Sequence, residues 1–197
     1  MKDELYSFDD VYRNRFGCIC GVDEAGRGPL AGPVCCAAVI LPPETRLEWL
    51  DDSKKVTPKR REQLFLEIKE KALDYHIELI DNATIDRLNI IQATLLGMKT
   101  CIESVKCDIA LIDGNAVPDS VRKCESIVKG DGKSASIAAA SSLAKVTRDH
   151  YMEELAKQYP EFGFEKHKGY PTRAHYEAIK KYGITDYHRK SFLKKIH

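Results

Sequence analysis

Short apolar runs alternate along this chain with longer segments of helical spacing. Five short runs are apolar, or alternate apolar with polar residues, as is typical of strands; they span residues 17–23, 33–41, 75–80, 108–113 and 125–129. Apolar residues three or four positions apart predict helices between them. One helix starts at Pro58, and three others cover residues 85–105, 134–158 and 173–181. A further short helix is expected within residues 1–16.

Polar residues mark where three of these helices begin. Thr57 directly precedes Pro58, and this order favours an N-cap followed by the first helical position. Thr84 and Ser134 are the expected N-caps of the two long helices. Residues 163–172 are expected to form a loop.

Five strands with long helices between them predict one α/β domain over residues 1–197. The first two strands follow each other across a turn, so we expect an antiparallel pair. The later strands are separated by helices and can run parallel. The sequence therefore predicts a mixed central sheet flanked by helices.

The turn between the first two strands carries unusual chemistry. Asp23 and Glu24 end the first apolar run, and Gly26 and Gly28 flank Arg27. If the strand ends at the aspartate, the turn brings the glutamate to the same side, where two carboxylates suit a hard cation. Glycines let a backbone approach a ligand closely, and the arginine favours an anionic one. A plain hairpin with two solvated acids is the alternative.

Two further strands end in acids. Asp113 follows an apolar strand in LIDGN, and Asp131 lies just beyond another in VKGDGKS. Because sites in open α/β sheets form at strand ends, we expect these acids to join Asp23 and Glu24. Four carboxylates without His or Cys favour Mg²⁺ or Mn²⁺ over zinc, and such a pair of ions can hydrolyse a phosphodiester. Each aspartate before a glycine can alternatively be a simple turn residue.

Composition narrows the class of protein. With 43% hydrophobic and 31% charged residues, the composition is typical of a soluble globular protein. No window holds 18 apolar residues, so no membrane-spanning helix is expected. The acidic N-terminus has no secretory signal, and the seven cysteines are expected as buried free thiols in a reducing cytoplasm. Their C-x-C and CC spacings argue against a zinc site.

Charge is uneven along the chain, although the net charge is only +1. Residues 143–197 hold 12 Lys and Arg against 7 Asp and Glu, whereas residues 1–142 hold 19 against 23. A basic C-terminal third suits a protein that cradles a phosphate backbone. A solvated surface of uneven charge is the alternative.

Six motifs in this order resemble the ribonuclease HII family, the type 2 ribonucleases H. They are DEAGRGPLAGPV from Asp23, DSKK with TPKRRE from Asp52, LIDGN at 111–115, VKGDGKSASIAAASSLAKVTRD at 128–149, HKGYPT at 167–172 and HRKSF at 188–192. The resemblance covers nearly the whole chain. It implies a ribonuclease H-like fold in which the segment from about residue 160 helps to form a nucleic-acid cleft, and no added N-terminal domain of the HIII type is expected.

The resemblance also implies roles for individual residues. The acidic quartet would bind the catalytic metals, Mn²⁺ or Mg²⁺; it is Asp23, Glu24, Asp113 and Asp131. The Gly26-Arg27-Gly28 turn is expected to grip a ribonucleotide through its 2′-hydroxyl, the group that distinguishes RNA from DNA. Lys54 would bind the phosphate backbone, and Tyr170 the nucleotide 3′ of the cut. A tyrosine that only anchors its loop is the alternative for Tyr170. No role follows for His167, Arg189 or Ser191.

The function implied is a cytoplasmic, metal-dependent endoribonuclease. It would cut the RNA strand of RNA–DNA hybrids, and cut 5′ of single ribonucleotides in duplex DNA as in ribonucleotide excision repair, leaving 3′-hydroxyl and 5′-phosphate ends. We expect a monomer without a membrane partner. A carboxylate–metal phosphatase acting on a small ester is the alternative enzyme. A non-catalytic RNA-binding module would lack the acids and carry an aromatic platform on a strand, and neither is seen.

Overall fold

A computed structural model of the chain describes residues 2–50 and 57–193. At its centre lies a five-stranded sheet in the order β3-β2-β1-β4-β5. The strands are β1 (Ile19–Ala25), β2 (Val34–Ile40), β3 (Asp74–Ile80), β4 (Ile109–Asp113) and β5 (Lys123–Ile127). β2 pairs antiparallel with β1 and β3, whereas β4 pairs parallel with β1 and β5. The predicted mixed sheet is confirmed, with β2 running against the other four described strands.

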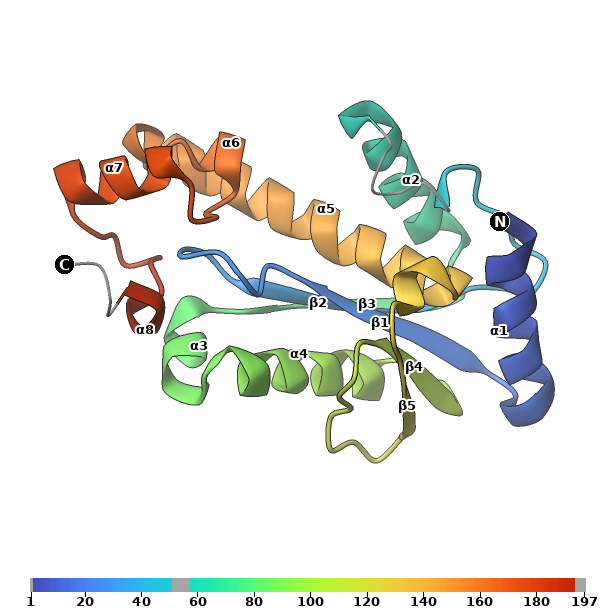
Figure 1. Ribbon diagram of the computed structural model, residues 1–197. Coiled ribbons are helices and arrows are strands. Elements are labelled where there is room, and N and C mark those ends of the chain that lie inside the picture. The colour runs from blue at the N-terminus through green and yellow to red at the C-terminus, as the bar shows by residue number, and fades with distance from the viewer. Residues whose placement is uncertain (1, 51–56, 194–197) are drawn as a thin grey trace.

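Helices cover both faces of this sheet (Figure 1). They are α1 (Lys2–Phe16), α2 (Pro58–Lys71), α3 (Asn82–Leu88), α4 (Ile90–Ser104), α5 (Ala135–Gln158), α6 (Phe164–His167), α7 (Arg173–Tyr182) and α8 (Lys190–Leu193). α5 and α2 lie over one face, and α4 with α3 over the other (Figure 1). None of the helices in the described ranges is long and apolar enough to cross a membrane.

Small residues let α5 lie directly against the sheet. A Cβ atom on Gly21 of β1 would come within 2.0 Å of the Ser136 carbonyl carbon, so only glycine fits beneath this helix. Ala138, Ala139 and Ala140 are almost fully buried in the same contact. The close approach brings the next turn of α5 over the end of β1, where the acids lie.

Asp9 of α1 fixes the N-terminus of α5. Its buried carboxylate accepts hydrogen bonds from the Ser134 hydroxyl (2.6 Å), the Ser136 hydroxyl (2.7 Å) and the Ser136 amide (2.9 Å). Burial raises the pKa of the Asp9 carboxyl, and these donors oppose that shift. A carboxylate at a helix N-terminus also interacts favourably with the helix dipole.

We expect Asp9→Ala to lower the free energy of unfolding by roughly 2–4 kcal/mol, because it leaves buried donors without an acceptor. Asp10→Ala on the same helix is the matched control; its carboxylate forms a partly exposed ion pair with Arg13, and such a pair contributes about 1 kcal/mol or less. Urea unfolding monitored by circular dichroism measures both variants. Equal midpoints for the two would contradict the role of Asp9.

Several sequence expectations about element boundaries need correction. The helix predicted over 85–105 is two helices, because Asn89 has φ = 74° and its side chain caps α4 through the amides of Ile91 and Gln92. The cap of α3 is Asp81 and not Thr84. Thr57 and Ser134 are N-caps as predicted.

Three further expectations about local structure differ from what is found. The predicted loop 163–172 contains the short helix α6. β5 lies two residues earlier than predicted, and residues 114–122 join it to β4 without a helix. All seven cysteines are free thiols, but Cys18 and Cys124 are partly exposed.

Candidate active site

Parallel pairing of β1 with β4 places the carboxyl ends of these strands at one edge of the sheet. Asp23 lies near the end of β1, and Asp113 is the last residue of β4. Asp23 is almost fully buried and accepts a hydrogen bond from Ser141 of α5. The fold therefore brings together two acids that are 90 positions apart in sequence.

Glu24 reaches the site differently from the sequence expectation. β1 does not end at Asp23; it continues through Ala25, because Glu24 and Ala25 pair with Cys36 and Cys35 of β2. Regular alternation then directs Asp23 toward α5 and Glu24 toward the other face. There Glu24 lines a cavity of about 370 Å³ together with Asp113 and residues of α4. Glu24 also lines a cavity with residues of α5, so it lies at the edge of the sheet within reach of both faces.

Asp131 follows β5 in a single 3₁₀ turn, Gly130–Gly132. The Gly130 amide donates to the Asp113 carboxylate at 2.6 Å, which ties this turn to the end of β4. This hydrogen bond holds the backbone of Asp131 next to the site. No three acidic, histidine or cysteine side chains in the described residues lie close enough together to hold one metal ion. The four acids share one edge of the sheet but do not converge on one point.

Electrostatic repulsion shows how closely the acids on β1 and β4 interact. Burial, and then the charge of Glu24, raise the pKa of the Asp23 carboxyl to about 8. Burial also raises the pKa of Glu24, and the charge of Asp113 adds to this shift while Arg27 opposes it. A site that resists ionisation in this way is stabilised by a bound cation.

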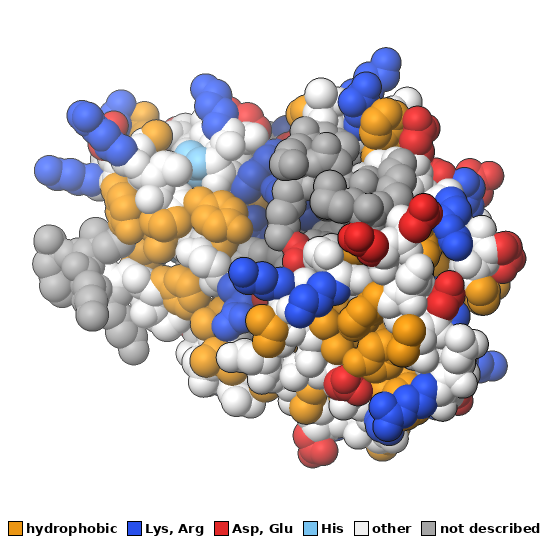
Figure 2. Space-filling view, turned by 45° about the vertical axis from the view of Figure 1, so that its right-hand side comes forward, with side chains coloured by type: hydrophobic (Ala, Val, Ile, Leu, Met, Phe, Trp, Pro, Cys, Tyr) orange, Lys and Arg blue, Asp and Glu red, His pale blue; other side chains and the backbone are white. Residues whose placement is uncertain are grey.

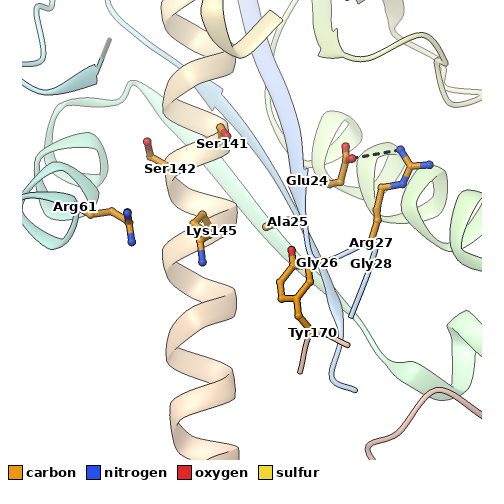
Figure 3. A pocket seen from close by; sticks show the side chains of 10 residues that line it. All are labelled: Glu24, Ala25, Gly26, Arg27, Gly28, Arg61, Ser141, Ser142, Lys145 and Tyr170. Atoms are coloured by element: carbon orange, nitrogen blue, oxygen red, sulfur yellow. Dashed lines mark ion pairs between the residues drawn. The ribbon is translucent and has the colours of Figure 1, made fainter. Parts of the chain in front are cut away.

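Beside the acids lies a second cavity, of about 440 Å³ (Figure 3). Its wall is formed by the turn after β1, by α5, by Arg61 of α2 and by Tyr170; the residues are Glu24, Ala25, Gly26, Arg27, Gly28, Arg61, Ser141, Ser142, Lys145 and Tyr170. Glu24 lines both cavities. A ligand in the second cavity therefore reaches the Glu24 carboxylate directly.

The glycine turn and the Tyr170 loop meet although they lie far apart in sequence. The Leu30 amide donates to the Gly169 carbonyl at 2.8 Å. A Cβ atom built on Gly28 would contact the ring of Tyr170 at 3.6 Å. Figure 3 shows the ring beside Gly26 and Gly28, on the side of the cavity that faces Lys145. The predicted substrate-binding residues Gly26, Arg27, Gly28 and Tyr170 therefore share one cavity.

Backbone contacts hold the Tyr170 loop in place. The Tyr170 carbonyl accepts from Nδ1 of the buried His175, whose Nε2 lies 3.1 Å from Nε2 of His188. Burial lowers the pKa of both imidazoles, that of His188 to about 4, so both are neutral at pH 7. His167 stacks on His175 at 4.6 Å between ring centroids and bonds the Phe162 carbonyl and the Gly169 amide. These contacts favour a structural role for His167.

Basic side chains surround the site from several elements. Arg27 is half exposed and forms an ion pair with Glu24 at 3.5 Å, while Lys145 pairs with Asp149 of α5. Figure 2 shows Lys and Arg side chains gathered near the middle of one face, with acidic side chains beside them. The basic cations of the cavity come from the turn after β1, from α2 and from α5, and thus only partly from the C-terminal third. Lys54 lies outside the described residues.

Sequence reasoning missed Ser141 and Arg148 in this region and assigned no role to Arg189. Ser141 bonds Asp23, and the buried Arg148 and Arg189 bond carbonyls of the turn between β1 and β2. A buried arginine cannot be distinguished in sequence from the many that are solvated. The one available signal was position, since both arginines lie in motifs of the resemblance.

The sequence of this chain is similar to those of known ribonucleases. The family model described as Ribonuclease HII matches residues 20–195. The ribonuclease HII of Endomicrobium trichonymphae is 53% identical over 98% of this chain and 93% of its own length, and that of Caldicellulosiruptor saccharolyticus is 50% identical over 95% and 93%.

Solved structures share the fold. Ribonuclease H2 from Pyrococcus horikoshii superimposes with a TM-score of 0.71 at 28% identity, covering 88% of this chain and 93% of its own. Ribonuclease HII from Archaeoglobus fulgidus, solved with PCNA, gives 0.77 at 27% identity over 87% and 93%. Bst-RNase HIII, solved with Mn²⁺, gives 0.59 at 18% identity over 84% of this chain and 63% of its own, which bears on the fold alone. The chain belongs to the ribonuclease HII family of endoribonucleases, which cut the RNA strand of RNA–DNA hybrids.

Proposed function

We propose that this enzyme also cuts duplex DNA 5′ of a single embedded ribonucleotide, leaving 3′-hydroxyl and 5′-phosphate ends. The arrangement of the two cavities around Glu24 carries this proposal. One cavity presents the glycine turn and an aromatic ring, which suit a sugar and its neighbouring nucleotide. The other cavity begins at the carboxylates. A nucleotide seated against the turn therefore brings its adjoining phosphate to the acids.

The acids fit a divalent cation, although no three of the described donors converge on one point. Their donor atoms are all oxygens, which Mg²⁺ and Mn²⁺ prefer. Mg²⁺ is commonly held by one or two carboxylates together with water and substrate phosphate, so a single tight cage is not required. We propose Asp23, Glu24, Asp113 and Asp131 as the ligands. Bound cations would stabilise charge that develops on the phosphate and on the leaving oxygen.

The surrounding residues have separate tasks in this proposal. Ser141 holds the Asp23 carboxyl in place. Arg27 neutralises Glu24 in the free enzyme and can exchange that carboxylate for a substrate phosphate, because arginine binds both groups through the same donors. Gly26 and Gly28 leave the turn without side chains. We also propose that the chain acts as a single-domain monomer in the cytoplasm. Tyr170 in the cavity wall supports a cleft to which residues from about 160 contribute one side.

A panel of labelled substrates tests this function at fixed Mn²⁺. It holds an RNA–DNA hybrid, a DNA duplex with one ribonucleotide, the same duplex without it, and p-nitrophenyl phosphate. We expect cleavage of the first two, with the product of the second ending in the 3′-hydroxyl of the deoxynucleotide before the ribose. Hydrolysis of p-nitrophenyl phosphate without cleavage of the single-ribonucleotide duplex would instead support a phosphatase.

Metal affinity is expected to depend on pH through Asp23. The pKa of this carboxyl is about 8 in the metal-free protein, and a ligand must lose its proton to bind. Below pH 8 the proton competes with the metal, so the apparent affinity for Mn²⁺ should fall as pH falls, by up to about tenfold per unit. Above pH 8 the dependence should flatten.

Isothermal titration with Mn²⁺ between pH 6 and 9 measures this dependence. Asp23→Asn is the control, because it should bind Mn²⁺ more weakly but lose most of the slope below pH 8. A wild-type affinity that is constant from pH 6 to 8 would show that Asp23 is not a proton-linked ligand.

A further inference from the structure

Arg189 is fully buried behind the glycine turn, and its guanidinium bonds four backbone carbonyls. Nη2 donates to Gly26 at 2.7 Å and to Pro33 at 3.0 Å, Nη1 donates to Arg27 at 3.0 Å, and Nε donates to Gly32 at 2.9 Å. One side chain from the C-terminal segment thus holds both ends of the turn that links β1 to β2. In Figure 1 this turn lies between α7 and α8.

These bonds determine which way two peptide groups face. The peptides of this turn are trans, as are all those of the described residues, and in a planar trans peptide the C=O and N–H groups point in opposite directions. The Gly26 carbonyl shares its peptide with the Arg27 amide, and the Arg27 carbonyl shares its peptide with the Gly28 amide. Because both carbonyls point inward to Arg189, both amides point outward, toward the cavity that these residues line.

The charge of Arg189 is kept although burial opposes it. Burial, together with the nearby charge of Arg148, lowers the pKa of Arg189 to about 9, so it remains a cation at pH 7. Backbone carbonyls are the acceptors of both guanidiniums. The planar guanidinium has five N–H donors and can bond four carbonyls at once, whereas the lysine ammonium has only three donors. The position requires arginine for its geometry as well as for its charge.

We propose that Arg189 is a positioning residue for ribose recognition: it turns the amides of Arg27 and Gly28 toward the substrate sugar and adjoining phosphate. This proposal rests on the proposed function of the glycine turn. Arg148 makes an instructive contrast. It is almost as buried and packs against Gly26, but its hydrogen-bond acceptors are Ala31, Pro33 and Lys168, so it bonds no carbonyl of the Gly26–Gly28 turn.

A second set of contacts aligns Arg189 itself. The Asp86 carboxylate of α3 accepts from the amides of Lys190 and Ser191, each at 2.9 Å, and from the Ser191 hydroxyl. The Arg189 amide donates to the Leu30 carbonyl at 2.8 Å. Loss of the Asp86 carboxylate would therefore loosen the segment that carries Arg189 without removing a buried side chain.

Steady-state kinetics with Mn²⁺ separate ribose recognition from general damage. KM is measured for a duplex with one ribonucleotide, and Ki for the same duplex without it as a competitive inhibitor. We expect Arg189→Lys to raise KM about tenfold, the effect of one substrate hydrogen bond, and to leave Ki within about threefold. We expect Arg148→Lys to change KM and Ki by the same factor. Thermal melting checks that each variant is folded.

The possible results are distinct. A variant with a smaller folded fraction has a lower kcat but an unchanged ratio of KM to Ki. If Arg189→Lys is folded and its ratio of KM to Ki equals that of the wild-type enzyme, the proposal is overturned. If Arg189→Lys does not fold, Asp86→Ala decides; we expect a smaller rise in the same ratio, about threefold, and an unchanged ratio would overturn it. If the wild-type enzyme shows no preference for the ribonucleotide, the proposed function fails, and this inference fails with it.

Discussion

Replacing Asp23 or Asp113 by asparagine is expected to reduce cleavage at least about a thousandfold, since loss of one metal ligand removes several kcal/mol of transition-state stabilisation. Both acids lie at the carboxyl ends of parallel neighbouring strands, where no other described side chain can replace them. Each change removes one charged oxygen and keeps the size of the side chain. The loss should appear in kcat with either an RNA–DNA hybrid or a single-ribonucleotide duplex.

Both variants should remain folded. The Asp23 carboxyl has a pKa of about 8, so it is largely uncharged at pH 7 without metal, and asparagine resembles that state. Asp119→Asn, an exposed acid in the connection after β4, makes the same chemical change away from the site and should retain full activity. More than about a tenth of the wild-type rate in Asp23→Asn at saturating Mg²⁺ would contradict the assignment, because a ligand is worth more than a factor of ten.

Tyr170→Ala should lose about 10- to 100-fold more activity on a single embedded ribonucleotide than on a long RNA–DNA hybrid, in line with the value of one stacked base. Tyr170 is 43% exposed, and its ring lies beside Gly28. The loop around it is held through main-chain bonds of Tyr170 to His167 and His175. A ring that does not anchor its own loop is available to contact a nucleotide, and the single-ribonucleotide substrate depends most on that one contact.

Tyr170→Phe separates the ring from the hydroxyl and should lose much less activity than Tyr170→Ala. Tyr176→Ala, an exposed tyrosine on the neighbouring helix α7, is the matched control and should behave like the wild-type enzyme on both substrates. Equal losses on both substrates in Tyr170→Ala, or a fall in melting temperature large enough to explain them, would return this tyrosine to a structural role.

The sequence predicted the sheet well but not the course of β1 past Asp23. Five apolar or alternating runs located five strands, because a strand buries one or both of its faces in the sheet. The acids of the site were found for the opposite reason: Asp23, Glu24 and Asp113 are charged where each run ends. The strand was expected to end at Asp23, whereas pairing with β2 extends β1 through Glu24 and Ala25. That pairing is a long-range contact which local pattern does not encode.

Buried polar contacts were the second gap. Asn89 stood inside an apolar helical pattern, and only its positive φ and its cap of α4 reveal the break. Sequence reasoning did not single out Asp9 and gave Arg189 no role, yet both are fully buried among hydrogen-bond partners. The hydrogen-bond partners of these residues are distant in sequence. Their burial therefore cannot be predicted from the local sequence pattern.

The carboxylates at the ends of β1 and β4 are expected to require a divalent cation to cut beside a ribonucleotide. The most direct measurement follows a labelled DNA duplex with one ribonucleotide in chelator, then after Mn²⁺ is added back in excess. We expect no cleavage in chelator, and a single cut 5′ of the ribonucleotide after Mn²⁺ is restored, with Asp23→Asn inactive in both. Cleavage that persists in chelator, or that Asp23→Asn carries out at the wild-type rate, would contradict the account.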